Sequence, residues 1–236
     1  MKLVRFTLVA LSPGLLLNPA TPELLDALRT KKQVQKRTDW SVEDEAGTKL
    51  YRSEVSAEDK AADIKGKMGL PTQNLMSCII NAGQHVKSGK KSLSTAKSTQ
   101  IFDFLEFVDD FCVFLDLDEK GNVPWKPFLV KGTMHAAGKE TAVCINRPRI
   151  AKWRIAFSVK YDDKREVDQS TLVKLVEIAG RKIGLCDWRP QKKGRFGRFV
   201  IEKVETFPLK EEKQDVKIVE YTDANAPADL KELVEA

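Results

Sequence analysis

The sequence is poor in the residues and motifs on which metal, redox and mononucleotide sites depend. Its 236 residues include two histidines and four cysteines, and no two cysteines have the close spacing of a zinc knuckle or a redox motif. The sequence spacing of the Ser, Cys, His and Asp residues does not reveal a Ser-His-Asp or Cys-His catalytic arrangement. No apolar run approaches the roughly 20 residues that span a bilayer, and no basic amphipathic helix stands out. We therefore expect no metal, no cofactor and no membrane contact.

The cysteines and the N-terminus favour a cytoplasmic protein. The cysteines lie far apart in apolar or helical sequence, and we interpret all four as reduced, buried thiols: Cys78, Cys112, Cys144 and Cys186. The first 22 residues have the charged, apolar and small-residue zones of a signal peptide. However, Arg5 interrupts the apolar run, and residues 2–9 alternate as a β-strand does. We expect a strand there rather than a cleaved leader.

Positive charge is concentrated in the first 204 residues. The net charge is +6, but residues 205–236 carry nine acids and four bases, which leaves 36 bases and 25 acids, or +11, on residues 1–204. This asymmetry favours a polyanionic partner whose binding depends on salt, because Lys and Arg displace condensed counterions. The basic segment at residues 29–37 has five bases and no acid, and we interpret it as a solvated helix end or loop.

The most informative stretch is Ala179–Val200, a glycine- and arginine-rich segment between a predicted helix and a predicted strand. Asp168 caps the helix predicted over residues 168–178, Gly180 is its expected terminator, and residues 199–204 have the mixed pattern of a half-buried strand. Between them a single acid, Asp187, faces seven bases: Arg181, Lys182, Arg189, Lys192, Lys193, Arg195 and Arg198. Such a loop suits a polyanion.

The chemistry of this segment fits a nucleic-acid strand better than a mononucleotide. Gly184, Gly194 and Gly197 are expected to free the backbone for close approach to a ligand, so that backbone N–H groups and guanidinium forks can bind phosphate oxygens. Trp188 and Phe196 could stack on bases or serve as core anchors in a solvated basic hairpin. The segment has neither a dinucleotide-binding Gly-x-Gly-x-x-Gly after a strand nor a P-loop.

The remaining pattern alternates strands and helices. Residues 2–10 predict a strand with Val4, Phe6 and Leu8 on its core face. Residues 21–29 predict a short helix. Residues 73–86 predict a packed helix with Thr72 near its start. Residues 101–117 predict a strand pair or one bent strand around Asp109-Asp110. Residues 38–68 are mostly polar, with the charged stretch 56–67 either a surface helix or a mobile insertion.

The third quarter of the chain predicts a loop followed by two strands. Five glycines and prolines make residues 118–140 loop-like, and strands are expected over 141–145 and 151–161 around Asn146-Arg147-Pro148-Arg149. In the second strand Trp153, Ile155, Phe157 and Val159 form an apolar face, and the opposite face is largely basic, with Lys152, Arg154 and Lys160.

This order predicts an α+β fold, a ferredoxin-like (RRM-like) antiparallel sheet with helices on one face and with insertions. We expect one domain over residues 1–206, with insertions at about 11–68 and 118–140, followed by an acidic C-terminal extension over 207–236.

Three features together resemble the RAMP superfamily, the RNA-binding subunits of CRISPR effector complexes. They are the first strand running into SPGLLLN (residues 12–18), the Gly69-Leu70-Pro71-Thr72 turn that opens the first helix, and the late helix leading through GLCDWRPQKKGRFGRF to a last strand. In that superfamily the glycine-rich loop lies beside bound RNA. The resemblance implies the same position for Gly184 and residues 194–198 here. The chain is also similar to a family of small phage-encoded proteins that share the Trp-Arg-Pro and Gly-Arg-Phe elements.

These observations predict a non-catalytic single-stranded nucleic-acid-binding protein, with RNA favoured over DNA by the resemblance and self-association or other protein subunits as further partners. The expected binding residues are the seven bases above, Gly184, Trp188, Gly194, Phe196, Gly197, and, outside the loop, Lys90, Lys91, Lys152 and Arg154.

Two alternatives remain open. One is a metal-independent endoribonuclease that uses His85, which lies near a predicted helix end and close in sequence to Lys90; the other histidine, His135, falls in a predicted loop. The other is an interaction protein that docks an acidic protein partner. Asp109, Asp110, Asp116 and Asp118 are interpreted as a solvated strand edge rather than a metal site, because adjacent residues of a strand point to opposite faces.

Overall fold

The computed structural model describes residues 1–19, 29–30, 40–61, 66–136, 139–162 and 167–209. The helix expected over residues 21–29, most of the basic segment 29–37 and the C-terminal extension beyond Leu209 therefore lie outside the described residues. Within them the fold is α+β with antiparallel sheets. None of the described helices combines the length and the apolar character that crossing a lipid bilayer requires.

The body of the molecule is a four-stranded antiparallel sheet in the order β11-β1-β10-β6. Its strands are β1 (Lys2–Ala10), β6 (Leu105–Phe107), β10 (Arg154–Tyr161) and β11 (Phe199–Pro208). The predicted strand at residues 2–10 is confirmed, and the one predicted over 151–161 begins three residues later, at Arg154. The last strand extends four residues beyond its predicted end. The sheet positions the loop that precedes β11.

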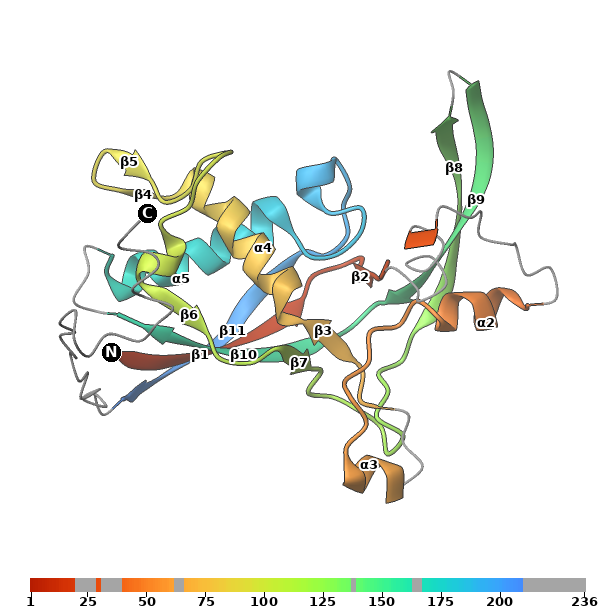
Figure 1. Ribbon diagram of the computed structural model, residues 1–236, viewed down its shortest axis with the longest axis horizontal. Helices are drawn as coiled ribbons and strands as arrows, with labels where there is room; N and C mark the ends of the chain where they lie inside the picture. Colours follow the sequence, from red (N-terminus) through yellow and green to blue (C-terminus); the bar gives the residue numbers. More distant parts are fainter. Residues whose placement is uncertain (20–28, 31–39, 62–65, 137–138, 163–166, 210–236) are drawn as a thin grey trace, which may run out of the picture.

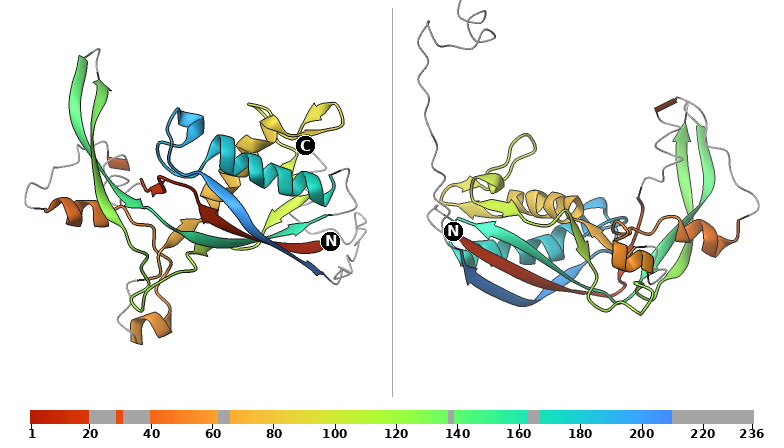
Figure 2. Two further views of the ribbon diagram at one scale, coloured as in Figure 1. Left: turned by 180° about the vertical axis from the view of Figure 1, so that it is seen from behind. Right: turned by 60° about the horizontal axis from the view of Figure 1, so that its bottom comes forward.

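Two helices cover one face of this sheet, α4 (Thr72–Ala82) and α5 (Gln169–Ile178) (Figures 1 and 2). The alternation predicted for β1 is confirmed, since Val4, Phe6 and Leu8 are fully buried beneath the helices. The apolar face predicted for β10 is buried as well. Burial of these side chains, at about 1.5–3 kcal/mol each, is the main force that holds helices and sheet together.

Of the two predictions for the ends of α5, the one for its start is correct and the one for its end is wrong. Asp168 caps the helix, accepting a hydrogen bond from the Thr171 amide at 2.8 Å. Gly180, however, does not end it. The helix continues as a π-helical turn, η3 (Ala179–Ile183), and the chain turns at Gly184, where φ is +76°. A Cβ at position 180 would overlap the Phe199 carbonyl oxygen, so Gly180 allows η3 to pack closely on the start of β11.

A long hairpin, which we call the arm, projects from this body (Figure 1). It consists of β8 (Lys126–Ala136) and β9 (Lys139–Ile150), and the short β2 (Leu15–Leu16) pairs with the base of β9. The predicted loop over 118–140 is therefore correct for residues 118–125 and wrong for residues 126–136, and the predicted break at residues 146–149 was wrong. Pro127 and Pro148 lie opposite each other in the ladder. Proline, a loop signal in sequence, is tolerated in peripheral strands where its missing N–H is not needed.

Shorter elements connect the body and the arm. The segment at 101–117 forms η2 (Ile101–Asp103), β6 and β7 (Phe111–Val113). The two strands flank Asp109-Asp110 as predicted. They do not pair with each other, because β6 pairs with β10 and β7 pairs with β3 (Gly69–Pro71). The remaining elements are α2 (Val42–Gly47), α3 (Ala57–Ala61), η1 (Gly83–His85), β4 (Lys87–Ser88), β5 (Lys91–Ser92) and η4 (Pro190–Lys192).

The cysteines are free thiols, but not all are buried as predicted. Cys78 and Cys112 are buried, Cys186 is partly buried, and Cys144 is exposed on β9. Its exposure follows from the arm, because only part of β9 is covered by other elements. Burial raises the pKa of the Cys112 thiol to about 11.

Candidate nucleic-acid interface

The basic loop, residues 184–198, joins η3 to β11 and is held by backbone hydrogen bonds, both within the loop and to the segment between β1 and β2. Gly194 N–H donates to the Arg189 carbonyl at 3.0 Å, and Gly197 N–H donates to the Gly14 carbonyl at 2.8 Å. A Cβ at Gly194 would overlap the Trp188 carbonyl oxygen, and one at Gly197 would overlap the Leu185 carbonyl oxygen. The glycines thus serve the internal packing of the loop, where we expected them to open it to a ligand. Side chains, rather than these amides, are the groups that remain for a phosphate.

The backbone of this loop is held in an unusual conformation. Three residues other than glycine have positive φ in the described part of the chain, and all three lie here: Cys186 at 59°, Trp188 at 47° and Lys193 at 61°. Each such residue costs on the order of 1–3 kcal/mol and persists only when surrounding contacts fix it. Cys78 on α4 supplies one such contact, because its thiol donates to the Gly184 carbonyl at 3.3 Å. Burial raises the pKa of this thiol and keeps it protonated as a donor.

An aromatic cluster joins the loop to the arm. Phe128 on β8 lies with its ring centroid 6.4 Å from that of Trp188 and 5.4 Å from that of Phe196. Phe196 is 3% exposed, so it anchors the loop and does not offer a face to a base. Trp188 is partly exposed. Of the two aromatic residues predicted to stack on bases, Trp188 is therefore the one that remains a candidate.

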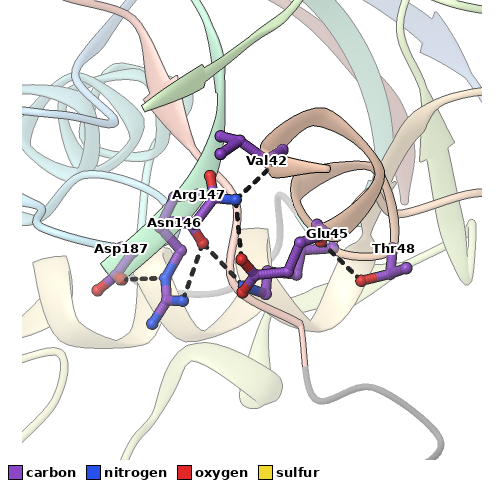
Figure 3. A network of polar contacts seen from close by, with 7 residues as sticks. Val42, Glu45, Thr48, Asn146, Arg147 and Asp187 are labelled. Carbon is purple, nitrogen blue, oxygen red and sulfur yellow. Dashed lines mark hydrogen bonds and ion pairs between the residues drawn. The ribbon is translucent and has the colours of Figure 1, made fainter. Parts of the chain in front are cut away.

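An ion pair reinforces the same junction. Arg147 on β9, the cross-strand partner of Phe128, donates from Nε to Asp187 Oδ2 at 3.2 Å. The single acid of the loop is thereby a structural anchor, and the Asp187 amide also donates to the Leu16 carbonyl at 3.0 Å. Figure 3 shows how the contact continues into α2. Asn146 donates to the Val42 carbonyl at 2.7 Å and to Glu45 at 3.1 Å, so α2, the arm and the loop share one polar network.

The positive charges of the basic loop and of η3 before it, which contains Arg181 and Lys182, divide into two groups. Arg189 is used internally, donating to the Cys186 carbonyl at 2.8 Å, and Arg198 is partly buried. Five others are exposed, and within the described residues none of them forms an ion pair with a carboxylate: Arg181, Lys182, Lys192, Lys193 and Arg195. These five are the loop cations. Arg195 also lies over the Phe196 ring, 5.8 Å from its centroid.

The strand face that we expected to be basic is largely neutralised. Arg154 on β10 pairs with Glu202 at 2.6 Å and with Asp116 at 3.2 Å, and Lys160 pairs with Glu106 at 2.9 Å. The acids come from β11, β6 and the segment after β7, so the spacing within β10 could not show them. Arg154 is therefore not a free phosphate ligand in this structure, whereas Lys152, in the turn before β10, is exposed.

The two other predicted lysines and the candidate histidine lie beyond the end of α4. Lys90 and Lys91 are exposed at the turn of the β4–β5 hairpin, and His85 is exposed in η1. Gln191 of the loop donates to Asn81 on the last turn of α4 at 2.8 Å, which fixes the loop against the helix that leads to this hairpin.

The acidic residues show no metal-binding arrangement. Among the described residues no group of three or more His, Cys, Asp or Glu side chains is placed to hold a metal ion. Asp118 instead closes a tight turn, accepting from the Lys120 and Asn122 amides at 2.9 and 2.8 Å.

The fold of this chain has matches among solved structures. No protein-family model and no curated protein matches the sequence. A chain in the cryo-EM structure of the Type III-B Cmr-beta bound to cognate target RNA is similar to this chain, with a TM-score of 0.46 and 10% sequence identity over 87% of this chain and 60% of that one. This protein thus spans about three fifths of that chain's length. A likeness at this level assigns neither family nor function.

Proposed function

We propose that the protein is a non-catalytic single-stranded nucleic-acid-binding protein that holds the phosphate backbone through the loop cations. The observation that carries the proposal is the contrast in charge pairing. The loop cations are exposed without a carboxylate partner among the described residues, whereas Arg154 and Lys160 on β10 are paired with acids. Unpaired Lys and Arg side chains can neutralise phosphates without first breaking an ion pair.

The partly exposed Trp188 favours a single strand over a duplex. Trp188 lies in the same loop as Lys192 and Arg195 and packs against Phe128, and its partly exposed side chain suits a base that is not stacked in a duplex. Stacking of one base on an aromatic ring contributes about 1–3 kcal/mol. The preference for RNA over DNA rests on the resemblance to the RAMP superfamily described above.

We also propose that the body is a ferredoxin-like domain within residues 1–206. In chain order the sheet strands are β1, β6, β10 and β11; α4 lies between the first two, and α5 lies between the last two. This β-α-β-β-α-β order supports the proposal. The arm and the segment of α2 and α3 are then the insertions, with the arm extending beyond the insertion expected at 118–140.

Fluorescence anisotropy with labelled single-stranded RNA, single-stranded DNA and duplex, at about 50 and 200 mM salt and with chelator present, tests this function. We expect single strands to bind more tightly than duplex, RNA more tightly than DNA, and all binding to weaken at the higher salt. Equal competition by short polyanions of any chemistry would instead support the acidic protein partner. Cleavage of RNA in chelator that is lost in His85→Ala would support the endoribonuclease.

A further inference from the structure

Strand β11 ends the four-stranded sheet, and within the described residues β1 is its one strand partner. Figure 2 shows it along the margin of the sheet. An edge strand of ten residues presents a row of backbone donors and acceptors that can pair with another strand. Its edge is therefore a candidate interaction surface, independent of nucleic-acid binding.

The hydrogen bonds at the two ends of β11 show which residues point outward. Leu209 N–H donates to the Met1 carbonyl, and at the other end Leu11 N–H donates to the Arg198 carbonyl. In an antiparallel pair, directly bonded positions alternate with unbonded ones. Counting from Leu209, the backbones of residues 207, 205 and 203 face β1, so those of Val204 and Thr206 face away from it.

The side chains around Val204 are self-complementary. Lys203 and Glu205 flank it on the uncovered face of the sheet, opposite Thr7 and Arg5 of β1, and they pair with each other at 2.7 Å. If a second copy pairs antiparallel with Val204 opposite the partner's Val204, then Lys203 lies opposite the partner's Glu205 and Glu205 opposite the partner's Lys203. Centring the pair one residue earlier or later would place Lys203 or Glu205 opposite its own copy, which like charge disfavours.

We propose that two copies of the chain pair antiparallel through β11, about a two-fold axis at Val204, to join their sheets into one. At this axis the outward N–H and C=O of Val204 exchange hydrogen bonds with those of the partner's Val204. The two Lys–Glu pairs occupy the unbonded positions, where side chains of neighbouring strands lie closest. Phe207, which is 46% exposed on the same face, gains cover from the partner's strand.

Charge reversal provides the sharpest test. Light scattering of the full-length protein over a range of concentrations should show a monomer–dimer equilibrium. Lys203→Glu alone, or Glu205→Lys alone, should weaken dimerisation by at least about tenfold, because each creates two like-charge contacts across the axis. The double variant Lys203→Glu/Glu205→Lys should restore the wild-type equilibrium. A wild-type protein that is monomeric at every concentration, or single variants that dimerise normally, would overturn the proposal.

A backbone variant controls for effects of the charges on the fold. Val204→Pro removes an N–H that points away from β1, so it spares the β1–β11 ladder. We expect Val204→Pro to be monomeric. Its circular dichroism spectrum and melting temperature should be close to those of Lys203→Glu/Glu205→Lys, which would show that it is folded. If Val204→Pro dimerises as strongly as the wild-type protein, this edge is not the interface. If Val204→Pro does not fold, the charge-swap series decides the question by itself.

Discussion

Arg147 on β9 and Asp187 in the basic loop form an ion pair, Nε to Oδ2 at 3.2 Å, across 40 residues of sequence. Both side chains are largely covered, with 20% and 26% of their surface exposed. The pair ties the loop to the base of the arm beside the contact between Phe128 and Trp188. The loop conformation therefore depends on the arm, an element that the sequence did not predict.

The first prediction is that this ion pair stabilises the fold. Arg147→Ala and Asp187→Ala should each lower the free energy of unfolding by about 1–3 kcal/mol, since each leaves a partly buried charge without its partner. Chemical denaturation measures the loss. The double variant should lose less than the sum of the two single losses. Additive losses would show that the two side chains do not interact.

The second prediction concerns the packing of the loop backbone. Gly194→Ala should lower the free energy of unfolding by more than about 2 kcal/mol, because its Cβ overlaps the Trp188 carbonyl oxygen and the loop must shift. Gly47→Ala is the matched control, since its Cβ meets the Trp125 ring at an ordinary 3.7 Å. It should change stability by no more than about 0.5 kcal/mol. Similar melting temperatures for the two variants would contradict the close packing.

The third prediction follows from the cap of α5. Hydrogen bonds from the Thr171 side chain, the Thr171 amide and Ser170 lower the pKa of the Asp168 carboxyl in the folded protein. A depressed folded pKa contributes stability that is present above the unfolded value, about 3.9, and is lost as pH falls through the folded value. Asp168→Ala should therefore melt below wild type at neutral pH, and the difference should narrow as pH falls below about 4. A difference that stays constant to low pH would show that ionisation of Asp168 contributes nothing.

Local patterns predicted the parts of the fold that local physics determines. Strand β1 and the Asp168 cap follow from alternation and from side-chain capping, which involve residues close in sequence. The arm was missed because Pro127 and Pro148 are loop signals that the structure places opposite each other in a ladder. That pairing joins residues far apart in the chain, so no local pattern reveals it.

The candidate site was predicted in composition but not in geometry. The sequence shows that residues 181–198 are basic, and the structure exposes five of their cations. The sequence could not show that Phe196 is buried against Phe128, or that Glu202 on β11 and Asp116 after β7 neutralise Arg154. The structural role of Asp187, the lone acid among these bases, depends on Arg147, which is identifiable as its partner only in the folded chain.

The salt dependence of single-stranded RNA binding, measured for wild type and two matched double variants, tests the role of the loop cations most directly. Lys192→Ala/Arg195→Ala removes two of them, and Lys97→Ala/Lys120→Ala removes two exposed lysines from other parts of the chain. We predict that the loop variant binds more weakly. The slope of log affinity against log salt, which is negative, should become shallower by about 1.4, or about 0.7 for each lost phosphate contact. The control variant should retain the wild-type slope. Equal slopes for the two variants would contradict a backbone contact through the loop.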